Sequence, residues 1–374
     1  MKPARLLYAS SKSADMLYGA KLHVPDPFLY LEYSGKRYLV MSDLEFSRAK
    51  AQAKGCTVLP LSRYHAHLKR DGRKATLENL IEALLTEKGI RSVVVPRDFP
   101  AWLYQKLVGK HYSIRTADGA FFPERAVKSA AEIRRIEEAQ RLNEGALELA
   151  LGMLRDADVR KGALYLDGKP LTSERIRTGI LHHFLDHEYS CPDGVIVSCG
   201  SHSALPHHQG SGQLYAAKPI ILDIFPRGQD GYWADMTRTV VKGDAPERLR
   251  RMFDAVLAAQ ETALSLVREG VLGSSVHSAV LKALEESGFP TKPGKTGPQG
   301  MIHGTGHGLG LDIHEEPRLA LAYAKEEPLV SGNVVSVEPG LYYPGFGGVR
   351  IEDIVLVQKG GCRNLTRAKK VLEL

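Results

Sequence analysis

Three histidines lie close together in a glycine-rich stretch between Met301 and Pro317. His303, His307 and His314 are interleaved there with four glycines. Imidazole is the commonest metal ligand and the usual proton carrier near neutral pH, and glycine lets the backbone approach a bound group closely. The pattern predicts a chemical site, although a glycine-rich surface loop with incidental histidines has the same letters.

Four carboxylates stand alone in stretches that are otherwise apolar and strand-like: Asp223, Asp235, Glu338 and Glu352. A carboxylate inside a sheet is costly unless it is paired or bound to a cation. Asp223 and Asp235 lie on two predicted strands joined by a Gly-containing loop, which is typical of a hairpin. We therefore expect these two side chains to converge at one level of the sheet.

Together with His307, the four carboxylates form a ligand set that suits two divalent metal ions of the Mn, Co, Fe or Zn type. Carboxylates can bridge two cations, and one imidazole adds a nitrogen ligand. Two metal ions that share a water molecule make it a nucleophile near neutral pH and polarise the carbonyl under attack. These residues predict metal-assisted hydrolysis if the fold brings them together.

Other reactive side chains carry weaker signals. Cys199 lies near the candidate site, but a small buried hydrophobic role is favoured over a thiol nucleophile. His182, His183 and His187 include an i,i+4 pair on one predicted helix, yet the general-base glutamate of the HExxH pattern is missing. We interpret these histidines as structural.

The composition is ordinary for a soluble globular protein, with 43% hydrophobic and 25% charged residues. The chain of 374 residues is too long for one core, so two domains are expected. No segment reaches the roughly 18 apolar residues that span a membrane. The four cysteines are scattered and form no CxxC pair, which is typical of a reducing compartment. We expect a cytoplasmic protein with no membrane partner.

Charge is distributed unevenly along the chain. Up to Arg125 there are 21 lysines and arginines against 12 acids, and from Ala126 onward 29 against 31. This asymmetry predicts a boundary between a first domain, 1–125, and a second domain, 126–374. The basic residues of the first domain are dispersed and accompany no nucleic-acid motif, so a solvated surface is favoured over a nucleic-acid partner.

Hydrophobic periodicity predicts a small α/β domain followed by a larger domain of helices and strands. In the first domain a hairpin joins 28–33 to 37–41, helices cover 43–54 and 77–88, and a short strand covers 93–95. The second domain opens on a long helix at Ser129, which has capping-box spacing with Glu132. Further helices are expected at 173–187, 246–269 and 275–286, and strands at 194–198, 219–225, 232–241, 333–338 and 348–357.

Residues 126–374 resemble the metallopeptidase family of methionine aminopeptidase, Xaa-Pro aminopeptidase, prolidase and creatinase. The matching motifs occur in family order: Pro206-His207, Asp223, Gly-Tyr-Trp-Ala-Asp235, His303-Gly-Thr-Gly-His307 with His314 following, Val-Glu338-Pro-Gly and Gly-Val-Arg350-Ile-Glu352-Asp. Each motif is weak alone, but together they are specific and cover the whole second domain. The resemblance implies an α+β fold: a C-terminal pita-bread (creatinase/aminopeptidase-like) domain with a smaller α/β N-terminal domain of the creatinase/prolidase type.

The resemblance also implies roles for the five candidate ligands. Asp223 would chelate one metal ion, and Asp235 and Glu352 would bridge both. His307 and Glu338 would complete the coordination of the second ion. Glu338 would in addition pass a proton from the bridging water to the leaving nitrogen.

Contacts to substrate are implied for a second group of residues. His207 and His314 would contact the substrate and stabilise the tetrahedral intermediate. His303 would line the pocket, and Arg350 would hold a ligand carboxylate in place.

One spacing departs from the family pattern. Asp223 and Asp235 are 12 positions apart, one more than the family leads us to expect. An extra loop residue could bulge harmlessly, or Asp230 could compete as the ligand. We favour Asp223 because its apolar strand context matches the family.

The first domain narrows the choice within the family, since methionine aminopeptidases do not normally carry one and creatinase uses no metal. Prolidases and Xaa-Pro aminopeptidases remain, which implies a homodimer and a peptide substrate with proline at its second position. Arg318 follows His314 by four residues, as in some prolidases where an arginine holds the free carboxylate of a dipeptide. A surface arginine explains Arg318 equally well, so dipeptidase and aminopeptidase both stay open.

Two further alternatives stay open. Some relatives keep this fold as non-catalytic binding modules, but those typically lose metal ligands that are intact in this chain. A hydrolase of another N-substituted amide would need a similar site.

Overall fold

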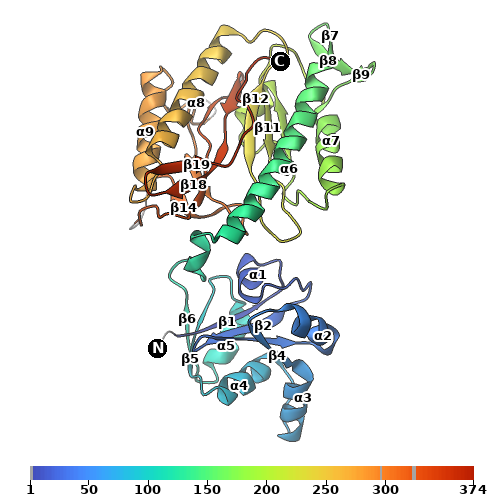
Figure 1. Cartoon of the computed structure of the whole chain (residues 1–374), viewed down its shortest axis with the longest axis vertical. Coiled ribbons are helices and arrows are strands. Elements are labelled where there is room, and N and C mark those ends of the chain that lie inside the picture. The colour runs from blue at the N-terminus through green and yellow to red at the C-terminus, as the bar shows by residue number, and fades with distance from the viewer. Residues whose placement is uncertain (1–2, 295–296, 322–325) are drawn as a thin grey trace. The chain divides into compact units, whose positions relative to one another are not determined.

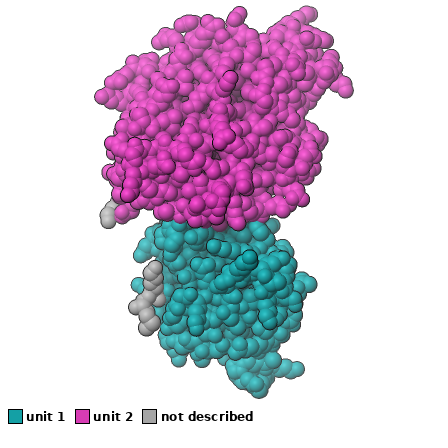
Figure 2. Space-filling model, in the orientation of Figure 1, with its two compact units in different colours: residues 1–125 teal, residues 126–374 magenta. Residues whose placement is uncertain are grey.

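The structure is a computed structural model of the whole chain, and it describes residues 3–294, 297–321 and 326–374. The chain divides into two compact units, residues 1–125 and 126–374 (Figures 1 and 2). Within the described ranges, no helix is long and apolar enough to cross a membrane.

The first unit is built on a mixed sheet with the strand order β4-β3-β2-β1-β5-β6. Helix α4 packs on this sheet through Ile81 and Leu84, which share a core with Val93 and Val95 of β5. The predicted hairpin of β2 and β3 is confirmed, but helix α2 ends two residues earlier than expected. The strands are β1 Ala4–Ala9, β2 Phe28–Tyr33, β3 Lys36–Met41, β4 Cys56–Pro60, β5 Ser92–Val95 and β6 Ser113–Thr116, and the helices are α1 Ala14–Ala20, α2 Asp43–Gln52, α3 Leu61–Arg70, α4 Leu77–Glu87 and α5 Ala101–Val108.

The second unit begins with a long helix, α6, that starts where its sequence supplies a cap. Ser129 accepts a hydrogen bond from the backbone of Glu132, and the Glu132 carboxylate accepts one from the backbone of Ser129, so the predicted capping box is confirmed. Helices α6 (Ala130–Arg155) and α7 (Ser173–Leu185) share an apolar core with the sheet of β10 (Ile196–Cys199), β11 (Ile220–Ile224) and β12 (Met236–Val240). A small sheet of β7 (Asp158–Arg160), β8 (Ala163–Leu166) and β9 (Lys169–Pro170) lies between α6 and α7 in the chain.

A second helix pair and a second sheet complete this unit. Helices α8 (Glu247–Leu266) and α9 (Gly273–Glu286) lie side by side (Figure 1) and share a core with strands of a sheet ordered β14-β13-β15-β18-β19. That sheet consists of β13 (Gly306–Gly308), β14 (Glu315–Leu319), β15 (Val334–Val337), β18 (Asp353–Gln358) and β19 (Gly361–Asn364). Strands β16 (Gly340–Tyr343) and β17 (Gly347–Arg350) form a hairpin.

The expectation of a single strand over 348–357 is wrong. The chain pairs with β16 as far as Arg350 and with β15 from Asp353 onward. At the switch, the backbone N–H of Glu352 donates instead to the carbonyl of Thr237, 3.1 Å away. Glu352 therefore sits where the chain leaves one ladder and joins another, which brings it beside β12.

Candidate metal centre and active site

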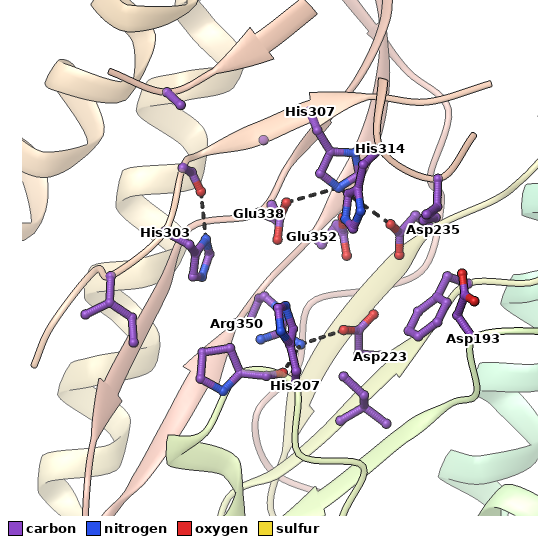
Figure 3. A pocket seen from close by; sticks show the side chains of 18 of the residues that line it. Asp193, His207, Asp223, Asp235, His303, His307, His314, Glu338, Arg350 and Glu352 are labelled. Atoms are coloured by element: carbon purple, nitrogen blue, oxygen red, sulfur yellow. Dashed lines mark hydrogen bonds and ion pairs between the residues drawn. The ribbon is translucent and has the colours of Figure 1, made fainter. Parts of the chain in front are cut away.

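One cavity of about 710 Å³ in the second unit collects the predicted site residues (Figure 3). Its lining includes all five candidate ligands and all five candidate substrate or supporting residues: Asp223, Asp235, His307, Glu338, Glu352, His207, His303, His314, Arg318 and Arg350. The carboxylates and imidazoles come from strands and from the segments that adjoin strands, and they face one space in Figure 3. Residues spread over more than a hundred positions of the chain thus converge on one space.

The two aspartates are placed by the pairing of β11 with β12. Asp223 is the register partner of Thr237, and side chains two residues apart on a strand point to the same face. Asp235 lies just before β12, two residues before Thr237, and its side chain lines the same cavity as that of Asp223. Gln140 of α6 fixes the Asp235 backbone: its amide accepts from the N–H at 3.2 Å and donates to the C=O at 3.0 Å.

His307 and Glu338 are placed by the close approach of β13 to β15. A Cβ atom on Gly306 would lie 1.9 Å from the carbonyl oxygen of Ser336, so only glycine allows these strands to come this near. Gln260 of α8 then donates to the carbonyls of Val337, at 3.0 Å, and Ile351, at 3.2 Å. One buried amide thus holds the residues directly before Glu338 and Glu352.

The imidazole of His307 is oriented for ligation. Its Nδ1 faces the carbonyl oxygen of Gly308 at 3.1 Å, and because that oxygen can only accept, Nδ1 carries the hydrogen. Nε2 then faces the Glu338 carboxylate at 3.2 Å and the Asp235 carboxylate at 3.8 Å. Burial lowers the pKa of His307, but its hydrogen bond to Glu338 and the nearby negative charges outweigh burial and raise that pKa.

Glu352 forms no ion pair with a described cation, and His307, 3.8 Å from Asp235, is hydrogen-bonded to Glu338 instead. Burial, and then the charge of the neighbouring carboxylates, raises the pKa of both side chains well above the usual range. Oε2 of Glu352 accepts from the Thr237 hydroxyl at 2.9 Å, whereas Oε1 has no hydrogen-bond partner in the described part of the chain. Ligand atoms of Asp235, His307 and Glu352 lie within 4.8 Å of one another. Buried like charges with an unpartnered oxygen and an available imidazole nitrogen fit a divalent cation.

Arg350 holds two residues of the site, Asp223 and Tyr342, in place. Its guanidinium contacts Asp223 at 2.5 Å and donates to the phenol oxygen of Tyr342 at 2.7 Å. Tyr342 in turn donates to Nε2 of His303 at 2.8 Å, because the other ring nitrogen faces the carbonyl of Gly304 at 2.7 Å and must carry the hydrogen. Both nitrogens of His303 are therefore engaged within the protein, and its ring forms a wall of the cavity.

The remaining predicted contacts lie at the cavity surface. Burial, then the charges of His307 and Arg318, lowers the pKa of His314 to about 4, so His314 is neutral near pH 7. His207 and Arg318 are exposed residues that line the same space. The side chain of Arg318 forms no ion pair with any residue the structure describes.

Comparison with known proteins identifies the family, because the sequence model for Metallopeptidase family M24 matches residues 134–359. The chain belongs to this family. It is 34% identical to the Xaa-Pro dipeptidase of Pyrococcus furiosus over 48% of each protein, about half their length. It is 28% identical to the Xaa-Pro dipeptidase of Pyrococcus horikoshii over 76% of each protein. The crystal structure of the prolidase from Pyrococcus horikoshii OT3 matches with a TM-score of 0.80 at 24% identity, over 99% of this chain and 95% of that one.

The likeness to prolidase structures confirms the expected fold of this M24 metallopeptidase, a C-terminal pita-bread domain with a smaller N-terminal domain. The prediction of a metallopeptidase is confirmed as well. The expected strand over 232–241 is shorter than predicted, because β12 begins at Met236. The loop between β11 and β12 therefore contains all the residues between Ile224 and Met236, including any extra residue in the spacing from Asp223 to Asp235. Asp230 lies in that loop, where it accepts from the backbone of Tyr232 at 3.1 Å, and it is not among the described residues that line the cavity.

Two groups that the sequence singled out are not part of the M24 cavity as described. Cys199 lies elsewhere, and burial raises the pKa of its thiol, which disfavours a thiolate nucleophile. His183 and His187 are engaged by backbone carbonyls: His183 contacts Leu142 at 3.2 Å, and His187 contacts His183 at 2.8 Å.

Sequence reasoning missed the buried amides that hold the ligand strands of this metallopeptidase. Gln140 and Asn143 occupy the i+4 and i+7 positions of an apolar helix face that begins at Ile136, and Asn143 donates to the carbonyl of Ile224 at 2.6 Å. Gln260 likewise lies on the buried face of α8. An amide at an apolar position of a helix is the signal that could have revealed them.

Proposed function

We propose that this metallopeptidase is a dinuclear-metal-dependent Xaa-Pro dipeptidase. The observation that carries the proposal is the convergence of four carboxylates and one imidazole on a single cavity, where burial and neighbouring carboxylates disfavour the charged forms of Asp235 and Glu352. Named relatives that are Xaa-Pro dipeptidases supply the substrate class. Because the matches to these dipeptidases cover 48% and 76% of each protein, the substrate is a proposal for this chain.

Five residues would hold the metal ions. Asp223 would ligate one ion, Asp235 and Glu352 would bridge, and His307 and Glu338 would ligate the other. Oxygen ligands with one imidazole suit Mn, Co, Fe or Zn, and Mn²⁺ is our first choice because carboxylates dominate the set. Bound ions of this kind supply a water that is nucleophilic near neutral pH and polarise the scissile carbonyl.

Glu338 is positioned to move the proton. Burial raises the pKa of Glu338, but its hydrogen bond and charge interaction with His307 outweigh burial and lower that pKa, so the side chain is a carboxylate near neutral pH. The Ser336 hydroxyl donates to Glu338 at 3.3 Å and accepts from the backbone of His307 at 3.0 Å, which fixes the carboxylate. A carboxylate held this way can accept a proton from water and return it to the leaving nitrogen.

Two further residues would contact the substrate. His314, whose ring is neutral, would bind the oxygen of the reacting carbonyl, and Arg318 would bind the free carboxylate. His314 can donate a hydrogen bond to a developing oxyanion without carrying a charge that repels the metal ions. Arg318 lines the cavity without an ion pair to any described residue, and its planar fork suits the free carboxylate of a dipeptide. These two residues favour a dipeptide over a longer peptide.

Hydrolysis of Ala-Pro and Ala-Pro-Pro tests the proposal. Metal-stripped protein should be inactive, and added Mn²⁺ or Co²⁺ should restore cleavage of Ala-Pro in preference to Ala-Pro-Pro. Glu338→Gln should lose this activity, whereas Glu286→Gln, an exposed glutamate at the end of α9, should keep it. Preferred cleavage of the longer peptide would instead identify an Xaa-Pro aminopeptidase, and no cleavage with either metal ion would refute the Xaa-Pro proposal.

We also retain the proposals of a homodimer and a cytoplasmic location. All four cysteines are free thiols, which suits a reducing compartment. Light scattering of the purified chain would test the dimer, and fractionation of the source cells would test the location.

A further inference from the structure

Among the described residues that line the cavity, two carry charged side chains beyond the proposed ligands and Arg350. These are Asp193 and Arg318, one acidic and one basic. Neither side chain forms a hydrogen bond or ion pair with a residue the structure describes. Arg318 is accounted for by the substrate carboxylate, whereas the proposed reaction assigns nothing to Asp193.

Asp193 lies in the turn that precedes β10. The side-chain amide of Gln209 donates to its carbonyl oxygen at 3.4 Å, so this contact involves the backbone and not the carboxylate. In Figure 3, Asp193 lies on the Asp223 side of the pocket and away from His303. The residue is exposed, so an entering ligand can reach its carboxylate.

Two apolar residues of the cavity lie close to Asp223 in the sheet or along the chain. Ile196 is the register partner of Asp223 across β10 and β11, and Phe225 follows Asp223 by two residues. Both line the cavity. A ligand that extends from Asp223 toward Asp193 therefore has apolar side chains as well as a negative charge within the same cavity.

We propose that Asp193 selects substrates with lysine or arginine as the residue before the scissile bond, an inference that rests on the proposed Xaa-Pro activity. Lysine and arginine have an apolar stem and a charged tip, which matches the combination of Ile196, Phe225 and Asp193. The α-ammonium group fits less well, because it is attached one carbon from the scissile carbonyl and must stay near the metal centre. A basic first residue and a free carboxylate would then face Asp193 and Arg318.

Lys-Pro and norleucine-Pro test this inference, because norleucine has the lysine stem without its charge. The Mn²⁺-loaded wild type should show a kcat/KM about two- to five-fold higher for Lys-Pro, the range expected of a solvent-exposed ion pair. The ratio should fall as salt is raised from about 0.05 to 0.5 M, because salt screens exposed charges. Asp193→Asn should bring the ratio to about one and leave norleucine-Pro hydrolysis unchanged, and Asp254→Asn, an exposed aspartate of α8, should not alter the ratio.

Other outcomes distinguish a failure of the Asp193 inference from a failure of the Xaa-Pro proposal. A ratio that Asp193→Asn does not change would overturn the inference, and so would an equal loss for both dipeptides, which would assign Asp193 to the α-ammonium group or to folding. Should the wild type cleave neither dipeptide, the Xaa-Pro proposal fails, and calorimetric titration with lysinamide and norleucinamide still decides the inference. Tighter binding of lysinamide that depends on Asp193 supports it, and equal binding refutes it.

Discussion

Replacing Glu352 with glutamine is expected to stabilise the metal-free protein while abolishing its activity. Glu352 is buried, and its Oε1 atom has no hydrogen-bond partner among the described residues. The nearby positive groups are engaged by other carboxylates, Arg350 by Asp223 and His307 by Glu338. Without a metal ion, a negative charge on buried Glu352 is uncompensated, which raises its pKa, so folding near neutral pH must either bury the charge or take up a proton.

The size of the effect follows from the charge, since glutamine places an uncharged amide nitrogen where the unpartnered Oε1 stood. A buried polar atom without a partner costs about 1–3 kcal/mol, and a charged one costs more. Glutamine keeps the shape and the acceptor that binds the Thr237 hydroxyl, at 2.9 Å in the wild type, but removes the charge. We expect the free energy of unfolding of metal-free Glu352→Gln to exceed that of the metal-free wild type by ~1–3 kcal/mol.

The neighbouring residue Asp353 provides a matched control. It is also fully buried, but its carboxylate contacts Arg238 at 2.8 Å, Lys370 at 2.7 Å and the Asn364 amide at 2.8 Å. Asp353→Asn leaves these cations without their counterion, and breaking such a buried pair costs about 3–5 kcal/mol. Two adjacent acid-to-amide substitutions should thus change stability in opposite directions.

Urea unfolding of chelator-treated protein, followed by fluorescence and circular dichroism, measures both effects. Adding Mn²⁺ should reverse the order of wild type and Glu352→Gln, because a ligand stabilises the fold in proportion to its affinity and the variant lacks one ligand. A metal-free Glu352→Gln protein that is no more stable than metal-free wild type would refute the reasoning, since Glu352 would then have a compensating group that its contacts do not show.

Three further substitutions test the support of the site. Gln140→Ala leaves the Asp235 backbone N–H and C=O unpaired. It should lower the free energy of unfolding by ~2–5 kcal/mol and weaken Mn²⁺ binding at least ten-fold in calorimetry. Gln105→Ala, at an exposed glutamine, is the control, and an unchanged Mn²⁺ affinity of Gln140→Ala would contradict the role of Gln140 in holding Asp235. Arg318→Gln should raise KM for Ala-Pro roughly ten-fold or more while hydrolysis of Ala-Pro-amide changes little, because a charge-assisted hydrogen bond contributes about 1.5–3 kcal/mol; equal losses for both substrates would exclude carboxylate binding. Gly306→Ala should destabilise the fold by ~1–3 kcal/mol and reduce activity, because the new Cβ meets the Ser336 carbonyl. Gly152→Ala in α6, which has open space around it, should be neutral or stabilising. Thermal melts of both variants measure the two changes in stability.

The elements that sequence predicted best are those with a strong local signal. The capping box at Ser129 begins α6 as expected, and the apolar run around Asp223 is the buried strand β11. Lone carboxylates in such strands were the most informative feature, because their cost implies a partner that local structure cannot provide. The sheet order and the convergence of five ligands depend on long-range pairing, which no local pattern encodes.

The missed features have a common physical origin. The break at Glu352 has no glycine or proline to mark it, because the interruption comes from a hydrogen bond to Thr237, far away in the chain. Asp193 lines the cavity, and Tyr342 accepts a hydrogen bond from Arg350 beside it. Both positions result from the packing of strands that are distant in sequence. Local periodicity predicts which faces are buried, and it leaves the partners across the core unspecified.

The chemistry of the buried supports suits the charge that the proposed centre must keep. Neutral amides hold the backbone at three of the four carboxylates: Gln140 at Asp235 itself, and Gln260 directly before Glu338 and Glu352. An amide fixes a strand through its carbonyl and N–H groups without neutralising the carboxylate that the strand presents, whereas a lysine or arginine in the same place would compete with a metal ion. Asn143 likewise holds the carbonyl of Ile224, directly after Asp223, but Asp223 differs from the other three because Arg350 also contacts its carboxylate. The fold thus fixes the ligand backbone with neutral groups, so that the carboxyl groups of Asp235 and Glu352 stay available to ligate a divalent cation, which would favour their charged forms.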